Sequence, residues 1–499
     1  MKLKHLSMVC ALACVAASAQ AQVTGTPAQA IIDDANANGR VLFVAGASAV
    51  QSGLGQIASS LFTGTNYYFV PTVGGPRSAS DYRAYAGKLA VAAGGWPAGS
   101  NVIIINRARG GSVNGVNPVA RGQAIESMAV TTASCTAGSG TSGAPFQCGT
   151  LDNRVPDAGI SDVAPAMFDG LYNTEGEPAE PALSPSELAT LTATPVYALA
   201  FGLPVTRNVP TSVKFNKSVL AAIMTGNVGT WDMLDTNLPA DDILLCRRVN
   251  GSGTQAVSNL YYGNYPCDTS LRANVPADRA SGSSWNGVDR FVVEGGSGFL
   301  DVIENSSSGH VRTCLDTAVD AAAKPFNPAA NVTTEVGYTG YNTADRAGNV
   351  VRVLMRDGVQ HKAIGVLSMD SLNSSTTTSK WTFRSLDGAG QVTWNGAIGT
   401  APVVTGTGKH PTLDNLIDGT WDQQGWISFN VPSSTTGNKL ALANNFAAAA
   451  RSPAILNSQA SLRWVTAAIP GTPDPTGTGQ VLRAGYLNND QCAPLNRNN

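Results

Sequence analysis

Charged residues are scarce in this 499-residue chain, and histidine is scarcer still. Lysine and arginine together number 32, aspartate and glutamate 34, and the formal net charge is −2. Nucleic-acid binding needs a concentrated basic surface, and no basic run occurs, so a nucleic-acid partner is not expected. The chain has four histidines, and no two cysteines have the CxxC spacing. The sequence therefore predicts neither a metal site nor a bound cofactor.

Long apolar runs are also missing. Beyond the first residues, no segment offers the roughly 18 uninterrupted apolar residues that a membrane-spanning helix needs, so no membrane span is expected. The first residues have the pattern of a secretory signal, with Lys2 and Lys4, an apolar core over 6–17 and a small-x-small cleavage site at 19–21. Residues 1–21 are therefore predicted to be a cleaved signal peptide, and the remaining chain to be periplasmic or secreted.

Six cysteines remain once the two in the predicted signal are set aside: Cys135, Cys148, Cys246, Cys267, Cys314 and Cys492. An even number of cysteines in an exported chain favours disulfides over metal ligands. Cys135–Cys148 and Cys246–Cys267 are the natural local pairs, which leaves Cys314 with Cys492. Spacing alone does not determine this connectivity.

A unit of apolar strand, Gly/Ser turn and helix-like stretch occurs three times. The first has a strand over 41–45 and a helical pattern from Val50 to Leu61. The second has a strand over 102–105, the turn Gly110-Gly111-Ser112 and a weaker helical stretch towards Met128. In the third, the turn RVNGSGT at 248–254 separates an apolar run at 243–245 from a helical stretch at 255–262. Continuous apolar strands that alternate with helices indicate an α/β fold.

Other segments complete this picture. Residues 194–205 read as a buried strand interrupted by Gly202 and Pro204, where the chain could cross between domains. An amphipathic helix is expected over 215–232 and another helix near 438–450. Residues 133–150 are expected to form a loop held by its two cysteines.

The turns suggest an anion site. A turn that leads into a helix presents free backbone N–H groups, and the helix dipole favours negative charge there. Any one such turn is more simply read as a capped loop, but three of them at the ends of strands can converge on one crevice. Arg248 adds a cation that can bind two oxygens at once, although an arginine alone could equally form a surface salt bridge.

Asp162 makes the expected anion more specific. Taken alone, this residue would be read as a helix cap or an Asx turn. Inside an anion site, its carboxylate would repel a fully ionised ligand, so the anion must carry a proton that it can donate. Phosphate near neutral pH carries one and sulfate does not. Asp162 therefore favours phosphate or a phosphate ester.

The order of these motifs resembles that of the periplasmic phosphate-binding proteins of ABC-type phosphate importers, within the type 2 periplasmic-binding superfamily. The resemblance extends from about residue 40 to 390. Its most specific parts are the loop 248–254, which has the pattern Arg-x-Asp-Gly-Ser-Gly-Thr except at Asn250, and the helix 219–231, which ends in Gly-x-Val-x-x-Trp. Looser matches lie at 45–50, 110–113, 160–162, 363–366 and 383–388.

The resemblance implies a two-domain α/β architecture, in which each domain is a mixed sheet flanked by helices and the ligand lies in the cleft between them. Domain 1 would comprise residues 22–202 and 369–499, and domain 2 residues 203–368. A monomer that serves an ABC-type permease is implied. The implied phosphate ligands are Arg248 as the cation and Asp162 as the proton acceptor, with amides and hydroxyls from Ser48, Ala49, Ser112, Ser252, Gly253 and Thr254.

Three departures from the family pattern stand out. Asn250 replaces an aspartate that pairs with the arginine, so Arg248 is expected to be less restrained. Ala49 replaces a residue that commonly carries a hydroxyl. The chain also has apparent insertions near 113–155, 265–290 and 390–425.

Besides a binding protein for transport, the sequence leaves a secreted serine hydrolase and a surface or matrix protein to be considered. A secreted hydrolase that uses Ser252 or Ser48 would need a histidine base, yet no histidine lies in a recognisable motif and no GxSxG elbow occurs. A metal-dependent phosphatase would need a cluster of carboxylates and histidines, which is not found, so the chain is predicted not to be an enzyme. A surface or matrix protein that keeps the binding-protein fold would fit the insertions and the Ser/Thr/Asn-rich loops.

Overall fold

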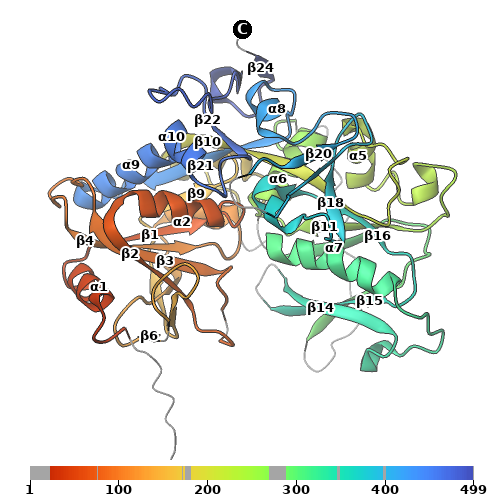
Figure 1. The fold of residues 1–499 in the computed structure, drawn as a ribbon, viewed down its shortest axis with the longest axis horizontal. Coiled ribbons are helices and arrows are strands. Elements are labelled where there is room, and N and C mark those ends of the chain that lie inside the picture. The colour runs from red at the N-terminus through yellow and green to blue at the C-terminus, as the bar shows by residue number, and fades with distance from the viewer. Residues whose placement is uncertain are drawn as a thin grey trace, which may run out of the picture.

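The computed structural model describes residues 23–75, 77–136, 138–170, 172–174, 181–268, 288–345, 349–396 and 400–497. The predicted signal peptide, 1–21, lies outside the described residues, as does most of the apparent insertion at 265–290. Figure 1 shows two lobes side by side, one holding α1, α2 and α9 and the other α5, α6 and α7. Within the described ranges, no helix is long and apolar enough to cross a bilayer.

The first lobe is built on a mixed sheet. Its strand order is β6 (Cys135–Thr136), β7 (Phe146–Cys148), β2 (Phe62–Pro71), β3 (Tyr82–Leu89), β4 (Asn101–Arg107), β1 (Val41–Gly46), β9 (Ala158–Ser161), β21 (Gln424–Pro432), β10 (Leu191–Thr206) and β22 (Thr466–Ala468). β1 runs parallel to β4 and β9, whereas β21 runs antiparallel to both β9 and β10.

Alternation along β1 explains why helices cover both faces of this sheet. Val41 and Phe43 pack into the cluster that includes α1 (Pro27–Ala37), whereas Leu42 and Val44 pack into the cluster that includes α2 (Gln51–Ser60) and α9 (Gly437–Arg451). Successive side chains of a strand point to opposite faces. An all-apolar strand such as β1 is therefore stable only between two covered faces.

The second lobe contains a second mixed sheet. Its order is β13 (Asp301–Asn305), β11 (Ile243–Arg248), β16 (Lys362–Gly365), the end of β10, β18 (Trp381–Arg384), β19 (Gln391–Thr393) and β20 (Val403–Thr405). The first three strands run parallel to one another, and α7 (Ser308–Ala322) packs on them. A smaller sheet of β12 (Asp289–Val293), β15 (Val350–Arg356) and β14 (Tyr338–Ala344) packs against α7.

Strand β10 belongs to both sheets. Residues 191–200 pair with β21 in the first sheet, and residues 203–206 pair with β18 in the second. The expected interruption at Gly202 and Pro204 does not occur, because both lie within the continuous strand. A Cβ on Gly202 would lie 2.7 Å from the Phe383 ring, so glycine permits the close packing there.

The two-lobed α/β class agrees with the sequence prediction, whereas the predicted domain boundaries stay a prediction. One segment departs from them. Residues 381–405 fall within the predicted first domain, but β18, β19 and β20 extend the second sheet. They do so because β18 pairs with the far end of β10, which has already crossed to that sheet.

Several predicted elements are confirmed, and two are shorter than expected. β1 with α2, β4, β11 with α6 (Gly253–Gly263), and α9 lie where the apolar patterns indicate. The helical stretch towards Met128 instead ends with α3 (Asn117–Arg121), because Gly122 turns left-handed and β5 (Ile125–Met128) pairs with β8 (Leu151–Arg154). The helix expected over 215–232 is α5 (Lys217–Met224), and Gly226 has φ of 78° beyond its end.

The remaining elements are short. They are the helices α4 (Pro185–Leu188), α8 (Leu413–Ile417) and α10 (Pro453–Ser458), the strands β17 (Leu367–Ser368), β23 (Ala484–Tyr486) and β24 (Leu495–Arg497), and the 3-10 turns η1 (Ser112–Gly115), η2 (Pro165–Met167), η3 (Trp231–Met233), η4 (Val332–Thr334), η5 (Met369–Ser374) and η6 (Leu487–Asn489).

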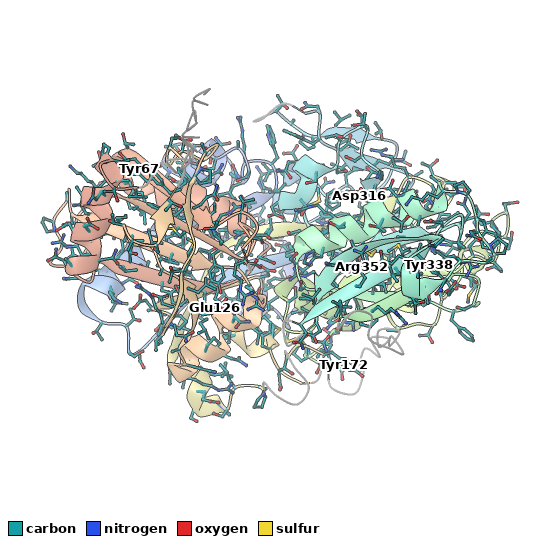
Figure 2. All side chains as sticks on the ribbon, turned by 90° about the horizontal axis from the view of Figure 1, so that it is seen from below. Tyr67, Glu126, Tyr172, Asp316, Tyr338 and Arg352 are labelled. Atoms are coloured by element: carbon teal, nitrogen blue, oxygen red, sulfur yellow. A yellow bond between two sulfur atoms is a disulfide. The ribbon has the colours of Figure 1, made fainter. Side chains whose placement is uncertain are left out.

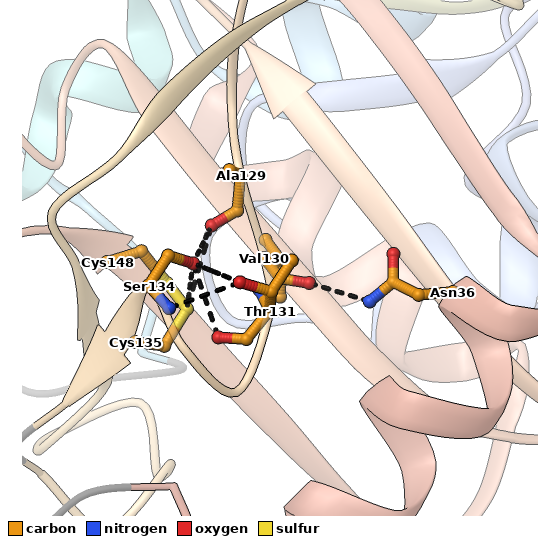
Figure 3. The surroundings of a disulfide bond; sticks show 7 residues. All are labelled: Asn36, Ala129, Val130, Thr131, Ser134, Cys135 and Cys148. Atoms are coloured by element: carbon orange, nitrogen blue, oxygen red, sulfur yellow. Dashed lines mark hydrogen bonds between the residues drawn. A yellow bond between two sulfur atoms is a disulfide. The ribbon is translucent and has the colours of Figure 1, made fainter.

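One of the natural local disulfide pairs is confirmed. Cys135 and Cys148 are bonded and lie on the neighbouring strands β6 and β7, so the loop between them is pinned as expected. Figure 3 shows how the turn beside this disulfide is held: the Ser134 hydroxyl donates to the Ala129 carbonyl, and Asn36 of α1 donates to the Val130 carbonyl.

The other local pair is wrong. Cys246 is bonded to Cys314, and Cys267 to Cys492. α7 packs over β11, so that the Cα atoms of Cys246 and Cys314 are 6.0 Å apart. The 11 residues of α6 meanwhile carry the chain roughly 16 Å away from the end of β11 before Cys267 is reached. Cys267 instead ties the segment after α6 to the carboxyl-terminal tail.

Candidate functional site

The turns that follow β4 and β11 meet where the two lobes touch. The backbone N–H of Val113 donates to the carbonyl of Gly251 over 2.9 Å. A Cβ on Gly111 would lie 3.0 Å from that carbonyl oxygen and 3.0 Å from the Ser252 Cα. Gly111 has φ of 81°, which favours glycine as well. Two of the three predicted turns are therefore in direct backbone contact.

Asp162, which follows β9, lies against the amino-terminal end of α6. A Cβ on Gly253, the first residue of that helix, would lie 2.6 Å from Asp162 Oδ2 and 2.3 Å from Ser112 Oγ. The backbone N–H of Asp162 also donates to Ser112 Oγ over 3.3 Å. Because Gly253 has no side chain, the segments that carry Ser112 and Asp162 both approach the amino-terminal end of α6 closely. The helix dipole favours negative charge at that end.

The carboxyl group of Asp162 is buried, with 1% of the residue exposed. Thr254 Oγ1 donates to its Oδ2 over 3.5 Å, while its Oδ1 has no hydrogen-bond partner among the described residues. Burial is the main reason that the pKa of Asp162 is raised to about 7, and the negative charge of Asp370 acts in the same direction. The positive charge of Arg248 lowers this pKa and is the largest opposing effect.

Arg248, at the end of β11, is also buried, with 1% of the residue exposed. Its Nε donates to the Asn305 carbonyl over 3.1 Å and its Nη2 to the Ser306 carbonyl over 2.9 Å. Its Nη1 donates to Ser308 Oγ over 3.2 Å and to Ser48 Oγ over 3.2 Å. Ser48 belongs to the first lobe and the other three acceptors to the second, so Arg248 spans the boundary between the lobes.

Asn250 does not leave Arg248 loosely held, contrary to the sequence expectation. Its Oδ1 accepts a hydrogen bond from Arg247 over 3.3 Å, and Arg247 forms an ion pair with Glu304. Asn250 thus accepts a hydrogen bond from Arg247. Backbone carbonyls and serine hydroxyls restrain Arg248.

The structure brings most of the predicted ligand-binding residues together. Ser112, Asp162, Gly253 and Thr254 form one contact group, and the electrostatic effect of Arg248 reaches Asp162. Ser252 is buried at the N-cap of α6. Ala49 is fully buried in the apolar core of the first lobe, so its methyl group serves packing.

The structure contains a fourth turn of this kind, which the sequence analysis does not predict. β13 is followed by Ser306-Ser307-Ser308 and then by α7, which repeats the pattern of strand, Ser turn and helix. Ser306 and Ser308 supply two of the acceptors for Arg248. The sequence signal for this turn is the apolar pattern of DVIEN at 301–305, which is followed directly by three serines.

No protein-family model matches this sequence, and no curated protein matches it. Among solved structures, the chain is similar to a phosphate ABC transporter substrate-binding protein with bound phosphate from Clostridium perfringens, at 11% identity and a TM-score of 0.40, over 85% of this chain and 98% of that chain. It is also similar to PstS from Borrelia burgdorferi, at 10% identity and a TM-score of 0.34, over 85% and 98% of the two chains.

A human phosphate binding apolipoprotein is a third such structure, at 13% identity and a TM-score of 0.29, over 60% of this chain and 80% of that one. Phosphate-binding proteins of ABC transporters are thus among the solved structures that the chain is similar to.

Proposed function

We propose that this chain is a non-enzymatic, periplasmic or secreted binding protein that holds inorganic phosphate between its two lobes. The observation that carries the proposal is the position of Asp162. Its buried carboxyl group faces the amino-terminal end of α6, with one oxygen unpartnered among the described residues. That oxygen can accept the proton that phosphate still carries near neutral pH.

The surrounding groups suit the rest of such a ligand. The helix dipole of α6 and the guanidinium of Arg248 offset the negative charge of phosphate. The hydroxyls of Ser48 and Ser112 can donate to its oxygens, while the Thr254 hydroxyl donates to Asp162. Above pH of about 7, where Asp162 is ionised, sulfate would present no proton to it, so a bare anion would face a carboxylate. The site is therefore expected to prefer phosphate.

We propose that β10 acts as a hinge between the lobes. Because one continuous strand joins the two sheets, a small change in its backbone near residues 200–203 would move one lobe relative to the other. Opening would separate Arg248 from Ser48 and expose the site. We propose that phosphate enters the open form and that closure restores the contacts now seen.

The contacts of Ser48 do not support it as a catalytic nucleophile. His310 Nδ1 lies 2.8 Å from Ser306 Oγ and 3.2 Å from Thr343 Oγ1, whereas Ser48 bonds to Arg248. A serine nucleophile would need its own histidine base. Among the described residues, no group of three or more His, Cys, Asp or Glu side chains could hold a metal ion.

Delivery of phosphate to an ABC-type permease by a monomer is the physiological role we propose. A surface or matrix protein with the same fold is the alternative. Permease and ATPase genes beside this one would favour transport, and their absence would favour the surface role.

Calorimetric titration of the phosphate-free protein with phosphate, and separately with sulfate, tests the proposal. We expect saturable heat with phosphate and a much weaker response to sulfate. No heat with phosphate would contradict the ligand assignment, and equal affinities for the two anions would contradict the role of Asp162.

A further inference from the structure

A cavity of about 330 Å³ lies between the lobes, beside the residues that hold Arg248. Val249, which follows Arg248, and Ser306, whose carbonyl accepts from Arg248, line it on the side of the second lobe. Gly110, which opens the turn to Ser112, lines it on the side of the first lobe. Pockets of this size accommodate small organic ligands. The cavity therefore lies next to the proposed phosphate site, and residues of both lobes that neighbour this site line it.

Arg107 is the unusual residue of this cavity. It ends β4, is 8% exposed and lines the cavity. Its Nη1 donates to the carbonyl of Arg109 over 2.7 Å, but its Nε has no hydrogen-bond partner among the described residues. No described carboxylate forms an ion pair with it at 4 Å or less. A buried guanidinium without a counter-charge is costly, so Arg107 is suited to an anion that comes from outside the chain.

Two further arginines line the cavity, Arg77 and Arg109. Both face Glu126, with Arg77 Nε 2.6 Å and Arg109 Nη1 3.6 Å from its Oε1. The hydrogen bond from Arg77 is the main reason that the pKa of Glu126 is lowered to about 2. Glu126 lies in the first lobe (Figure 2). The same lobe provides all three arginines of the cavity. Glu126 thus balances the charge of Arg77 and Arg109 and forms no ion pair with Arg107.

Two aspartates also line the cavity, and each is engaged locally. Asp81 Oδ2 accepts hydrogen bonds from the backbone N–H and the hydroxyl of Ser78, both over 2.8 Å. Asp345 accepts from the backbone N–H of Asn349 over 2.7 Å and from its side-chain amide over 2.9 Å. Neither pairs with Arg107, so the positive charge of that residue stays available to a ligand.

We propose that this cavity binds a second phosphoryl group of the ligand. The inference rests on the proposed function, because the first phosphoryl group would occupy the site at Asp162 and Arg248. The ligand class would be phosphate compounds with a second, anionic phosphoryl group, of which inorganic pyrophosphate and tripolyphosphate are the simplest. Arg107 would neutralise the added charge, and the hydroxyl of Ser306 could donate to its oxygens.

Calorimetry with four probes tests this inference: phosphate, pyrophosphate, tripolyphosphate and glycerol 3-phosphate. We expect pyrophosphate or tripolyphosphate to bind about tenfold or more tightly than phosphate, as one charge-assisted contact would give. Glycerol 3-phosphate fills similar space without a second anionic group, so it should bind no more tightly than phosphate. If neither condensed phosphate exceeds phosphate, or glycerol 3-phosphate matches them, the inference is overturned while the proposed function stands.

The variant R107Q assigns the effect to Arg107. It should abolish the preference for condensed phosphates and leave the affinity for phosphate unchanged. R107M, which replaces the buried guanidinium by an uncharged apolar side chain, provides a second test should R107Q fail to fold. R154Q, which removes an arginine on β8 that pairs with Asp152, is the control and should keep the preference.

An unchanged preference in R107Q, or in R107M where that variant has to be used, would overturn the inference. Failure of phosphate itself to bind the wild type would overturn the proposed function instead. In that case, tight pyrophosphate binding that R107Q removes would still support the second-phosphoryl site.

Discussion

The guanidinium of Arg248, at the end of β11, donates a hydrogen bond to the hydroxyl of Ser48 in the other lobe, over 3.2 Å. The same nitrogen donates to Ser308 Oγ within its own lobe. One arginine therefore connects the turn that leads into α2 in one lobe with the amino-terminal end of α7 in the other. A ligand bound at this arginine would be linked directly to the relative position of the lobes.

Replacement of Arg248 by methionine should weaken phosphate binding by about 2–5 kcal/mol, because it removes a buried cation from a buried anion. Calorimetric titration measures this loss. The control is Arg352→Met, which removes an arginine of β15 that pairs with Glu335 in the second lobe (Figure 2). That variant should keep the affinity for phosphate. An unchanged affinity in the Arg248 variant would place this residue outside the binding site.

Replacement of Asp162 by asparagine should narrow the difference between phosphate and sulfate. The amide removes the negative charge and can donate to sulfate, while it loses the acceptor that suits a protonated phosphate. A charged hydrogen bond contributes about 1.5–3 kcal/mol, and the discrimination should shrink by that order. Parallel titrations with the two anions measure it. If the variant still rejects sulfate as strongly as the wild type does, Asp162 is not what discriminates.

The raised pKa of Asp162 makes the stability of the ligand-free protein depend on pH. The folded state keeps its proton up to pH of about 7, whereas the unfolded chain loses it near the ordinary value of 3.8. The folded state thus binds more protons between these values, and the free energy of unfolding falls as pH rises from about 4 to about 7. For an isolated group this fall amounts to at most about 4 kcal/mol.

Urea unfolding of the phosphate-free wild type and of Asp162→Asn between pH 4 and 8 tests this dependence. The variant carries no titrating group at this position, so its stability should fall less steeply with pH. The pKa of Asp370 is raised to about 6 mainly by burial, so this group contributes a slope of the same sign in both proteins. Parallel pH profiles of the two proteins would contradict the prediction.

The disulfide connectivity predicts a definite pattern of cross-linked peptides. Proteolysis of the non-reduced protein should yield peptides that join Cys246 to Cys314 and Cys267 to Cys492. Mass spectrometry of the fragments identifies them. Replacing both Cys246 and Cys314 by alanine should lower the free energy of unfolding by about 2–4 kcal/mol, since it releases a long loop. A peptide that joins Cys246 to Cys267 would contradict the structure.

Local sequence patterns were enough to locate the strands that end at the site. β1 and β11 are continuous apolar runs followed by helical periodicity, and both signals act over a few residues. Because each turn comes directly after its strand, Asp162, Arg248 and the Ser/Gly turns could be placed together from the sequence. The same reasoning supported the two-lobed α/β class.

Long-range packing could not be predicted from these local sequence patterns. The Cys246–Cys314 bond depends on α7 lying across β11, which spacing does not encode. Arg248 is restrained partly by the backbone carbonyls of Asn305 and Ser306, and a carbonyl acceptor leaves no signature in the side-chain sequence. The replacement of an aspartate by Asn250 therefore suggested a looser arginine than the structure contains.

Gly253→Ala offers the sharpest test of how closely the site is packed. A Cβ at this position would lie 2.3 Å from Ser112 Oγ and 2.6 Å from Asp162 Oδ2, so one of the contacting segments would have to move. Overpacking of this kind costs about 1–3 kcal/mol in stability, and the shift should weaken phosphate binding at the same time. Thermal unfolding and calorimetry measure the two effects.

The matched control is Gly309→Ala, near the start of α7. There the nearest atom to a new Cβ would be Ser307 Oγ at 3.4 Å, an ordinary contact distance. Alanine favours a helix over glycine, so this variant should be as stable as the wild type or more stable, with unchanged affinity. If Gly253→Ala behaved like this control, the close approach of Ser112, Asp162 and α6 would not exist in solution, and the proposed site would lose its basis.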